Sequence, residues 1–259
     1  MLTFKSALFG DIPSPSSLYE LLDIAKNASP KGRSVYMWRG QSDILWPIHS
    51  GAYRRLALEQ QPSEFDLSYY EKGLLDRATH RGYRFLDGRT LSDFELLARL
   101  QHHGAATRLL DATRSILVAL YFACAENMSK TGVLLGWHNY FIGGYEEQTN
   151  NETYDEIIKG LAEHDHPQTW QPTEVSPRIA AQHSQFLYSR IADDPRGSVC
   201  IDPSPGSLLA VALRPEVKSD FIQTLSEQFD VRLSTIFPDI DGFGRANSVS
   251  IRKSENYRW

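Results

Sequence analysis

Short runs of polar side chains set between strongly apolar segments are the feature that most constrains this chain. Four such runs lie at residues 38–41 (WRGQ), 101–104 (QHHG), 107–111 (TRLLD) and 113–115 (TRS). The segment that follows them, residues 116–125 (ILVALYFACA), is almost entirely apolar. Burying polar side chains is costly unless they pair with one another or bind something. The pattern therefore favours a built site in a folded core over a solvated surface.

Local patterns predict a mixed α+β chain. Apolar spacing and capping residues predict helices, as at Ser63, where Asp66 three residues on is close to a capping box. Runs of β-branched or aromatic residues predict strands. The expected helices cover residues 17–27, 63–80, 92–103, 115–127 and 214–229, and the expected strands cover 35–38, 131–137, 197–201, 208–213 and 231–236. Asp239, Asp241 and Gly242 are too few for a calcium loop and predict a turn.

The length of the chain and the absence of a linker indicate its domain organisation. With 259 residues, of which 41% are hydrophobic, the chain can bury a core as one sizeable domain or two small ones. It contains no internal repeat, low-complexity tract or clear linker, so we expect a single domain over residues 1–259. Residues 138–172 are polar and irregular, and we interpret them as an insertion-like excursion from the core with a helix at 152–163.

The net charge argues against one class of nucleic-acid-binding protein, and the cysteine content excludes two kinds of cysteine-based site. The formal net charge of -5 argues against a protein whose main role is to coat nucleic acid. A brief encounter through a local basic patch stays allowed, at Arg54-Arg55 or at the series Arg77, Arg81, Arg84 and Arg89, although each alone is more typical of a solvated helix face. The two cysteines, Cys124 and Cys200, exclude a disulfide framework and a four-thiolate zinc site.

The sequence shows no targeting segment and none of the common nucleotide-binding or hydrolase motifs. The N-terminal residues lack the apolar core and cleavage site of a signal peptide, and no segment reaches membrane-spanning length, so we expect a cytoplasmic protein with no membrane partner. The sequence contains no GxxxxGK loop, no GxGxxG after a strand and no GxSxG elbow. No His-x3-His pair suggests a metal site, and we predict none.

The polar runs resemble the FRG domain, a bacterial family named for a Phe/Tyr-Arg-Gly signature. Here the signature is Trp38-Arg39-Gly40, followed by Gln41. The resemblance continues in chain order through Trp46-Pro47, Arg54-Arg55, residues 101–113, residues 115–123, residues 178–182 (RIAAQ) and residues 237–242 (FPDIDG), and so covers about residues 33–245. Ala112 stands where the family usually has an aromatic, and Ser184 where it usually has Gly. Ala112 would widen a pocket wall, and Ser184 makes a turn with positive φ there less favourable.

A weaker resemblance links the chain to the ADP-ribosyltransferase fold. That fold also begins its site with an aromatic-Arg-Gly strand end, and its Ser/Thr-rich strand before an apolar helix is similar to Thr113-Arg-Ser115 and the helix after it. The resemblance implies small antiparallel or mixed sheets with packed helices, NAD as a substrate, and no metal. A catalytic Glu on a later strand completes the family's site, and Gln182 is its nearest counterpart here.

Four residues are predicted to be catalytic: Arg39, His102, Asp111 and Gln182. Arg39 has a planar fork suited to a pyrophosphate or ribose, and the alternative is a bridge to Asp111 or Asp43. His102 and His103 would face about 100° apart on a helix, so only one can face the site, as a base or a ribose ligand. For each histidine taken singly, a structural role is as favoured as a role in the site.

The other predicted site residues would support Arg39 or bind the cofactor. Asp111 would orient Arg39 or a histidine, with a buried helix cap as the alternative. Gln182 shares a face with Arg178 and could bond a ribose hydroxyl, but a Gln cannot replace a carboxylate, so Asp111 or Glu174 would have to supply the charge. The predicted cofactor-binding residues are Arg39, Gly40, Gln41, Thr107, Thr113 and Ser115, of which the last two would use a helix N-terminus that favours phosphate.

The sequence therefore predicts an NAD-dependent ADP-ribosyltransferase-like enzyme. Its expected setting is a toxin or phage-defence effector that modifies DNA or RNA, with an antitoxin or defence-system partner. Two alternatives stay open: a non-catalytic nucleotide-binding sensor module, and a hydrolase of NAD or another nucleotide.

Overall fold

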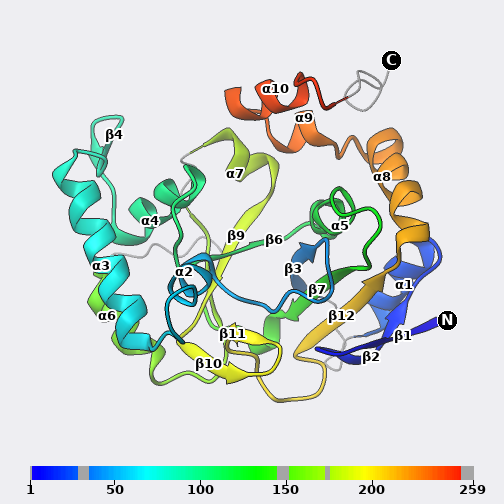
Figure 1. Cartoon of the computed structure of the whole chain (residues 1–259), viewed down its shortest axis with the longest axis horizontal. Helices are drawn as coiled ribbons and strands as arrows, with labels where there is room; N and C mark the ends of the chain where they lie inside the picture. The colour runs from blue at the N-terminus through cyan, green and yellow to red at the C-terminus, as the bar shows by residue number, and fades with distance from the viewer. Residues whose placement is uncertain (1, 29–34, 145–151, 173–175, 252–259) are drawn as a thin grey trace.

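A computed structural model describes residues 2–28, 35–144, 152–172 and 176–251. The architecture is α+β, centred on one six-stranded antiparallel sheet (Figure 1). Across the sheet the strands follow the order β12 (Leu208–Leu213), β7 (Gly132–His138), β3 (Tyr36–Gln41), β6 (Leu110–Thr113), β9 (Ser184–Tyr188) and β8 (Gln168–Trp170). Two-stranded antiparallel sheets are formed by β1 (Leu2–Ser6) with β2 (Gly10–Ser14), β4 (Phe85–Leu86) with β5 (Arg89–Thr90), and β10 (Ile191–Asp194) with β11 (Gly197–Val199).

Helices cover one face of the sheet. Tyr36 and Trp38 of β3 point to this face, as alternation along a strand requires, and pack with α1 (Leu18–Asn27), α5 (Ile116–Cys124) and α8 (Pro215–Phe229). The α5 helix is apolar nearly all round because it lies between the sheet and α8. This cluster holds the right half of the molecule in Figure 1 together.

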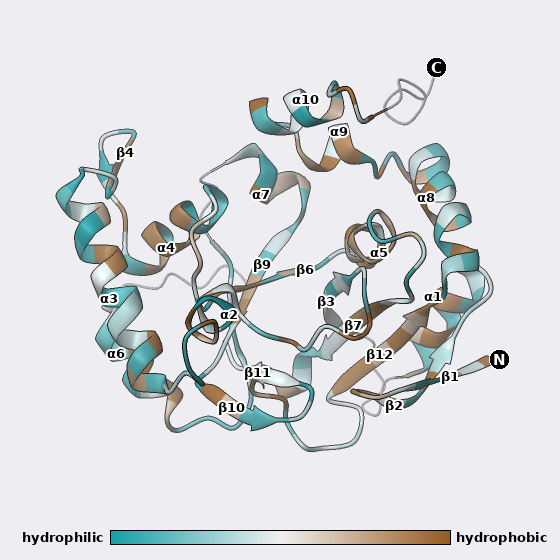
Figure 2. Cartoon of the chain, viewed as in Figure 1, coloured by the Kyte–Doolittle hydropathy of each residue, from teal (hydrophilic) through white to brown (hydrophobic). Residues whose placement is uncertain are grey.

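The opposite face is covered by hairpins and a loop. Met37 packs there with Ile12 of β2, Val199 of β11, and Ile44 and Ile48 of the loop after β3. Figure 2 shows β12, an outer strand of the sheet, as apolar along its length, which fits its position between helices and the β1–β2 hairpin.

A third core lies at the β8–β9 end of the sheet. There α3 (Glu64–His80), α4 (Asp93–His102) and α6 (Tyr154–Leu161) pack against the two strands. Phe94 contacts Trp170 and Tyr188 edge to face, at centroid distances of 5.7 and 4.9 Å. The short helices are α2 (Gly51–Leu56), the 3-10 helix η1 (Asn139–Phe141), α7 (Pro177–Ala181), α9 (Leu233–Ile236) and α10 (Ile240–Ala246).

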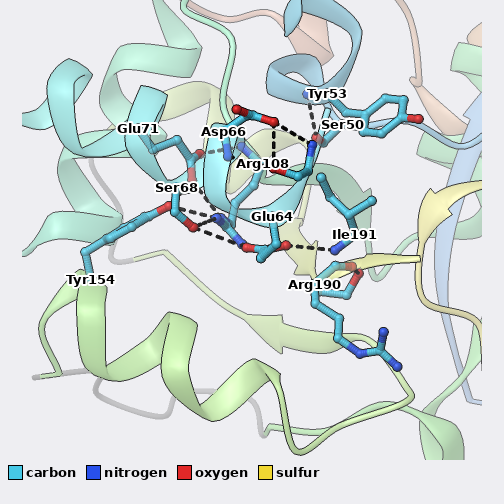
Figure 3. A network of polar contacts seen from close by, with 12 residues as sticks. Ser50, Tyr53, Glu64, Asp66, Ser68, Glu71, Arg108, Tyr154, Arg190 and Ile191 are labelled. Atoms are coloured by element: carbon cyan, nitrogen blue, oxygen red, sulfur yellow. Dashed lines mark hydrogen bonds and ion pairs between the residues drawn. The ribbon is translucent and has the colours of Figure 1, made fainter. Parts of the chain in front are cut away.

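Arg108 is the centre of a buried polar network in this part of the fold (Figure 3). Its backbone N–H and its Nε both donate to the Glu71 carboxylate at 2.6 Å, and its Nη2 donates to the Tyr154 hydroxyl at 2.8 Å. Glu64 accepts from Arg108 Nη1 at 2.9 Å and from the backbone N–H of Ile191 at 2.8 Å. The network satisfies every charge it buries and joins α3, α6 and the segment before β6.

Glycine lets α5 approach the sheet closely. A Cβ on Gly40 would lie 1.9 Å from the carbonyl oxygen of Ala119, and a Cβ on Gly132 would lie 2.4 Å from that of Ala123. Neither position tolerates a side chain with the helix in place, because real Cβ atoms do not approach backbone that closely. The glycine of the Arg-Gly signature therefore has a packing reason in this fold.

Most predicted elements are confirmed. The helices predicted at 17–27, 63–80, 92–103, 115–127, 152–163 and 214–229 correspond to α1, α3, α4, α5, α6 and α8. The strands predicted at 35–38, 131–137, 197–201 and 208–213 correspond to β3, β7, β11 and β12, with β3 continuing through Arg39 and Gly40 to Gln41. Ser63 and Asp66 form the predicted capping box.

Three predictions are wrong. The segment 231–236 is not a strand, since Leu233–Ile236 is the helical turn α9, and Leu233 and Ile236 are both buried. The predicted turn at 239–242 is the start of α10, where the Asp239 carboxylate accepts from the N–H of Gly242. Nor do residues 138–172 leave the core as a whole, because Tyr154 is buried and Trp170 belongs to β8 of the main sheet.

Over the described residues, no helix combines the length and apolarity needed to cross a membrane.

Candidate functional site

The central sheet opens between β3 and β6. The β7 strand pairs along the whole of β3, whereas β6 pairs with β3 only at Trp38 and Thr113. Beyond that pair the Arg39 side chain bridges the two strands, donating from Nη1 to the backbone carbonyl of Asp111 at 2.7 Å. Its Nε donates to Oε1 of Gln41, two residues along the same strand face, at 3.3 Å. The split strands thus hold one guanidinium where ladder hydrogen bonds would otherwise form.

Arg39 lies in the shared wall of two cavities. The smaller, of about 340 Å³, is lined by His102, Asp111, Thr113 and Gln182 among others. The larger, of about 1050 Å³, opens on the other side and is lined by the loop after β3, α2, α5, α8 and the C-terminal helices. Arg39, Gly40, Phe122 and Phe237 line both. The volume of the smaller cavity lies near the lower end, and that of the larger near the upper end, of the range of about 300–1,000 Å³ for small-molecule and cofactor sites.

The charge of Arg39 has no carboxylate partner among the described residues. Its two side-chain hydrogen bonds go to the Gln41 amide and a backbone carbonyl, and none of the ion pairs that these residues form involves it. Burial lowers the pKa of Arg39, and nearby Arg54 lowers it further, while Asp111 acts in the opposite direction. An arginine stays charged in proteins. A partly enclosed cation that forms no ion pair with the described residues favours the binding of an anion.

His102 faces the smaller cavity and His103 does not. His102 is the last residue of α4 and is half-buried, whereas His103 is exposed and caps the helix. Burial lowers the pKa of His102, with further lowering by Arg178 and His103 that Asp239 and Asp241 oppose. The ring is therefore neutral at pH 7 and can accept a proton. Of the two histidines, His102 alone lines this cavity, which agrees with the expectation that the two rings point in different directions.

Asp111 lines the smaller cavity from an exposed position on β6. Its Oδ1 accepts from Nε2 of Gln101 at 2.6 Å, and its backbone carbonyl accepts from Arg39. The alternative of a buried helix cap is wrong, since the side chain is exposed. Among the described residues it is the one carboxylate that lines this cavity. Glu174, the other predicted source of negative charge, lies outside the described residues.

Several predicted ligand residues have structural partners instead. Thr107 is fully buried outside both cavities, where its hydroxyl donates to Gln101 and accepts from the N–H of Leu109. Ser115 is the N-cap of α5 and also lines neither cavity. Thr113 lines the smaller cavity, but its hydroxyl donates to the Gln182 carbonyl at 2.7 Å and accepts from the N–H of Ser115 at 3.0 Å.

Gln182 and Arg178 share the smaller cavity, as their spacing predicted. The Gln182 amide donates to the carbonyl of Ile236 at 3.0 Å, so its Nε2 is committed to α9. Ala112 and Ser184 line the same cavity. The positive φ falls on His183 and not on Ser184, so the serine carries no strain there.

Comparison with known protein families identifies the segment that carries the signature. The FRG domain family matches residues 34–132. We refer to residues 34–132, the part of the chain that matches, as the FRG domain. No curated protein and no solved structure matches the chain.

The FRG domain supplies only part of the site. Arg39, His102 and Asp111 lie within it, together with all of α5. Arg178, Gln182 and Phe237 follow it in sequence and close the smaller cavity from α7 and the C-terminal helices. Strands β8, β9 and β12 of the central sheet also lie outside the FRG domain, so the two parts of the chain share one sheet.

The C-terminal helices α9 and α10 cap the cleft beside the FRG domain (Figure 1). Arg178 donates to both oxygens of Asp239, at 2.7 and 2.8 Å, and its guanidinium lies 5.0 Å from the Phe237 ring centroid. Phe237 also meets Phe122 of α5 edge to face at 5.9 Å. Sequence reasoning missed this contact set, because residues 61 positions apart form the ion pair.

No group of three His, Cys, Asp or Glu side chains that could hold a metal ion occurs in the described part of the chain.

Proposed function

We propose that the chain binds NAD across the two cavities and transfers its ADP-ribosyl group, as an ADP-ribosyltransferase-like enzyme. One observation carries the proposal: Arg39, a cation without a carboxylate partner among the described residues, separates two cavities, and His102 and Asp111 line the smaller one. A pyrophosphate on Arg39 would place one half of the dinucleotide on each side. The bidentate fork of arginine suits that group.

The chemistry asked of the smaller cavity is modest. The bond between nicotinamide N1 and ribose C1′ breaks, and its electron pair leaves with nicotinamide, which becomes neutral. C1′ then bonds to the acceptor's nitrogen or oxygen, and neutral His102 takes the proton that this atom loses. Asp111 would stabilise the positive charge that develops at C1′, a role that Gln182 cannot fill because its amide is neutral and bonded to Ile236.

The test is to incubate the protein with NAD labelled in the ADP-ribosyl group, together with DNA, RNA or cell lysate. Nicotinamide release and label transfer are measured separately. We expect both, with transfer to nucleic acid. Release without any acceptor would instead identify a hydrolase. If neither nicotinamide release nor label transfer occurs under any condition, the proposal that the protein is an enzyme is wrong.

A binding module without catalysis is the second candidate. Asp111 is the one carboxylate that lines the smaller cavity among the described residues, and it is exposed to water, which weakens its field. Stabilisation by NAD with neither release nor transfer would support this candidate.

Arg39→Gln locates the site under either candidate. We expect NAD to raise the melting temperature of the wild type, by about 2–4 °C for each kcal/mol of binding linkage in a chain of this size. Arg39→Gln should show no such rise, because the pyrophosphate loses the cation that lies between the two cavities. The control is Arg81→Gln on the exposed end of α3, which lines neither cavity. An equal NAD response in both variants would place the site elsewhere.

A further inference from the structure

Besides Arg39, three arginines among the described residues line the larger cavity, and two of them, Arg232 and Arg245, form ion pairs. Arg54 of α2 is exposed and lines this cavity, and its side chain forms no hydrogen bond or ion pair with any described residue. It lies close enough to Arg39 and to His49 to lower the pKa of both. Like charges held together are unfavourable until an anion binds between them.

His49 adds a donor beside Arg54. Its Nδ1 accepts from the backbone N–H of Ser198 at 3.0 Å, and its ring stacks on Tyr53 at 4.4 Å. Burial lowers the pKa of His49, and Arg54 lowers it further. The ring is therefore neutral at pH 7. With Nδ1 accepting, its proton is on Nε2, which can donate to a phosphate oxygen.

An exposed aromatic ring belongs to the same cavity. Trp46 lines it from the loop after β3, and 48% of its surface is exposed although the residue is large and apolar. Gln41 holds this loop, donating from Nε2 to the Trp46 carbonyl at 2.8 Å. An arginine and an exposed aromatic ring in one cavity are the combination that binds single strands, because the cation contacts the phosphate and a base stacks on the ring.

We propose that the larger cavity also receives the acceptor strand, and that single-stranded nucleic acid binds there beside half of the NAD, with a phosphate on Arg54 and His49 and a base on Trp46, so that a neighbouring base reaches the smaller cavity past Arg39. The inference rests on the proposed function, since it names the acceptor of that transfer. A base inside a duplex cannot reach an enclosed site, so the strand must be single or locally unpaired. Two or three contacts of this kind suit a chain whose net charge is -5.

The test measures oligonucleotide binding without NAD. Fluorescence anisotropy of labelled single-stranded DNA and RNA is followed for the wild type, Arg54→Gln and Arg55→Gln. The last is a matched control, because Arg55 neighbours Arg54 on α2 but lies 5.7 Å from the Tyr70 ring centroid and lines neither cavity. We expect Arg54→Gln to weaken binding about tenfold and to reduce the slope of log K against log salt by about 0.7. Arg55→Gln should match the wild type.

The same phosphate chemistry could come from the donor, so a second arm titrates NAD and ADP-ribose. Three results would overturn the inference. The wild type binds no oligonucleotide, Arg54→Gln binds it as Arg55→Gln does, or Arg54→Gln weakens NAD binding as much as or more than oligonucleotide binding. None of these depends on nicotinamide release, which tests the proposed function by itself.

Discussion

At the scale of single residues, the ring of His102 is set to remain neutral at neutral pH. Burial, then Arg178 and His103, lower its pKa below the ordinary 6.5. Because only the neutral ring accepts a proton, we expect the transfer rate to be constant above pH 6.5 and to fall on the acidic side. The fall lies on the acidic side because the neutral ring is the reactive form, and the lowered pKa moves the fall away from neutral pH.

His102→Gln tests that assignment. The variant should lose about a hundredfold or more in rate, the usual contribution of a positioned base, and with it the acidic fall in the pH profile. His103→Gln is the control, because that ring is exposed and lines neither cavity. An acidic fall that survives in His102→Gln would assign the titration to a group other than His102.

At the scale of elements, the contact between β3 and α5 depends on Gly40. We expect Gly40→Ala to destabilise the fold by about 1–3 kcal/mol or more, since its Cβ would lie 1.9 Å from the Ala119 carbonyl oxygen and the helix must move. Urea unfolding measures the change. Gly160→Ala is the control: this glycine lies in α6 with nothing within 4 Å of its Cβ, so the substitution should stabilise by up to about 1 kcal/mol. Unchanged stability in Gly40→Ala would mean that the signature glycine serves a ligand and not the packing.

Elements with a long or strongly capped pattern could be predicted from the sequence, and short ones could not. The capping box at Ser63 and the apolar α5 are local signals, and both are confirmed. In contrast, a six-residue segment with Leu233 and Ile236 fits a strand or a single helical turn, and its burial decides for the turn. Asp239 shows the same ambiguity, because the carboxylate geometry that closes a turn also caps a helix.

Part of the candidate site could also be predicted from the sequence, and part could not. The polar runs and the family resemblance located Arg39, His102, Asp111 and Gln182, which line one cavity. They did not separate these from Thr107, whose hydroxyl is used inside the fold. The ion pair of Arg178 with Asp239 and the position of Phe237 depend on contacts between distant segments, which no local pattern encodes.

At the scale of the whole molecule, the C-terminal helices complete a cleft that the FRG domain only begins. Three polar contacts attach residues 231–246 to the rest at the rim, in addition to the buried Leu233 and Ile236: Arg178 with Asp239, Gln182 with the Ile236 carbonyl, and Arg245 with Glu126 at 2.9 Å. Segments held by few polar contacts open locally at a lower free energy than the core. Ligand entry would then need no more than the release of this cap.

Asp239→Asn tests how the cap is held. Asparagine caps a helix about as well as aspartate, so α10 keeps its N-cap while the ion pair with Arg178 is lost. Hydrogen bonds to charged groups are worth about 1.5–3 kcal/mol, so amide exchange over residues 231–246 should become about tenfold faster or more while α5 is unaffected. Asp241→Asn makes the same charge change on the exposed first turn of α10 and should exchange like the wild type. Equal exchange in the two variants would show that packing of Phe237 against Phe122, and not the ion pair, holds the cap in place.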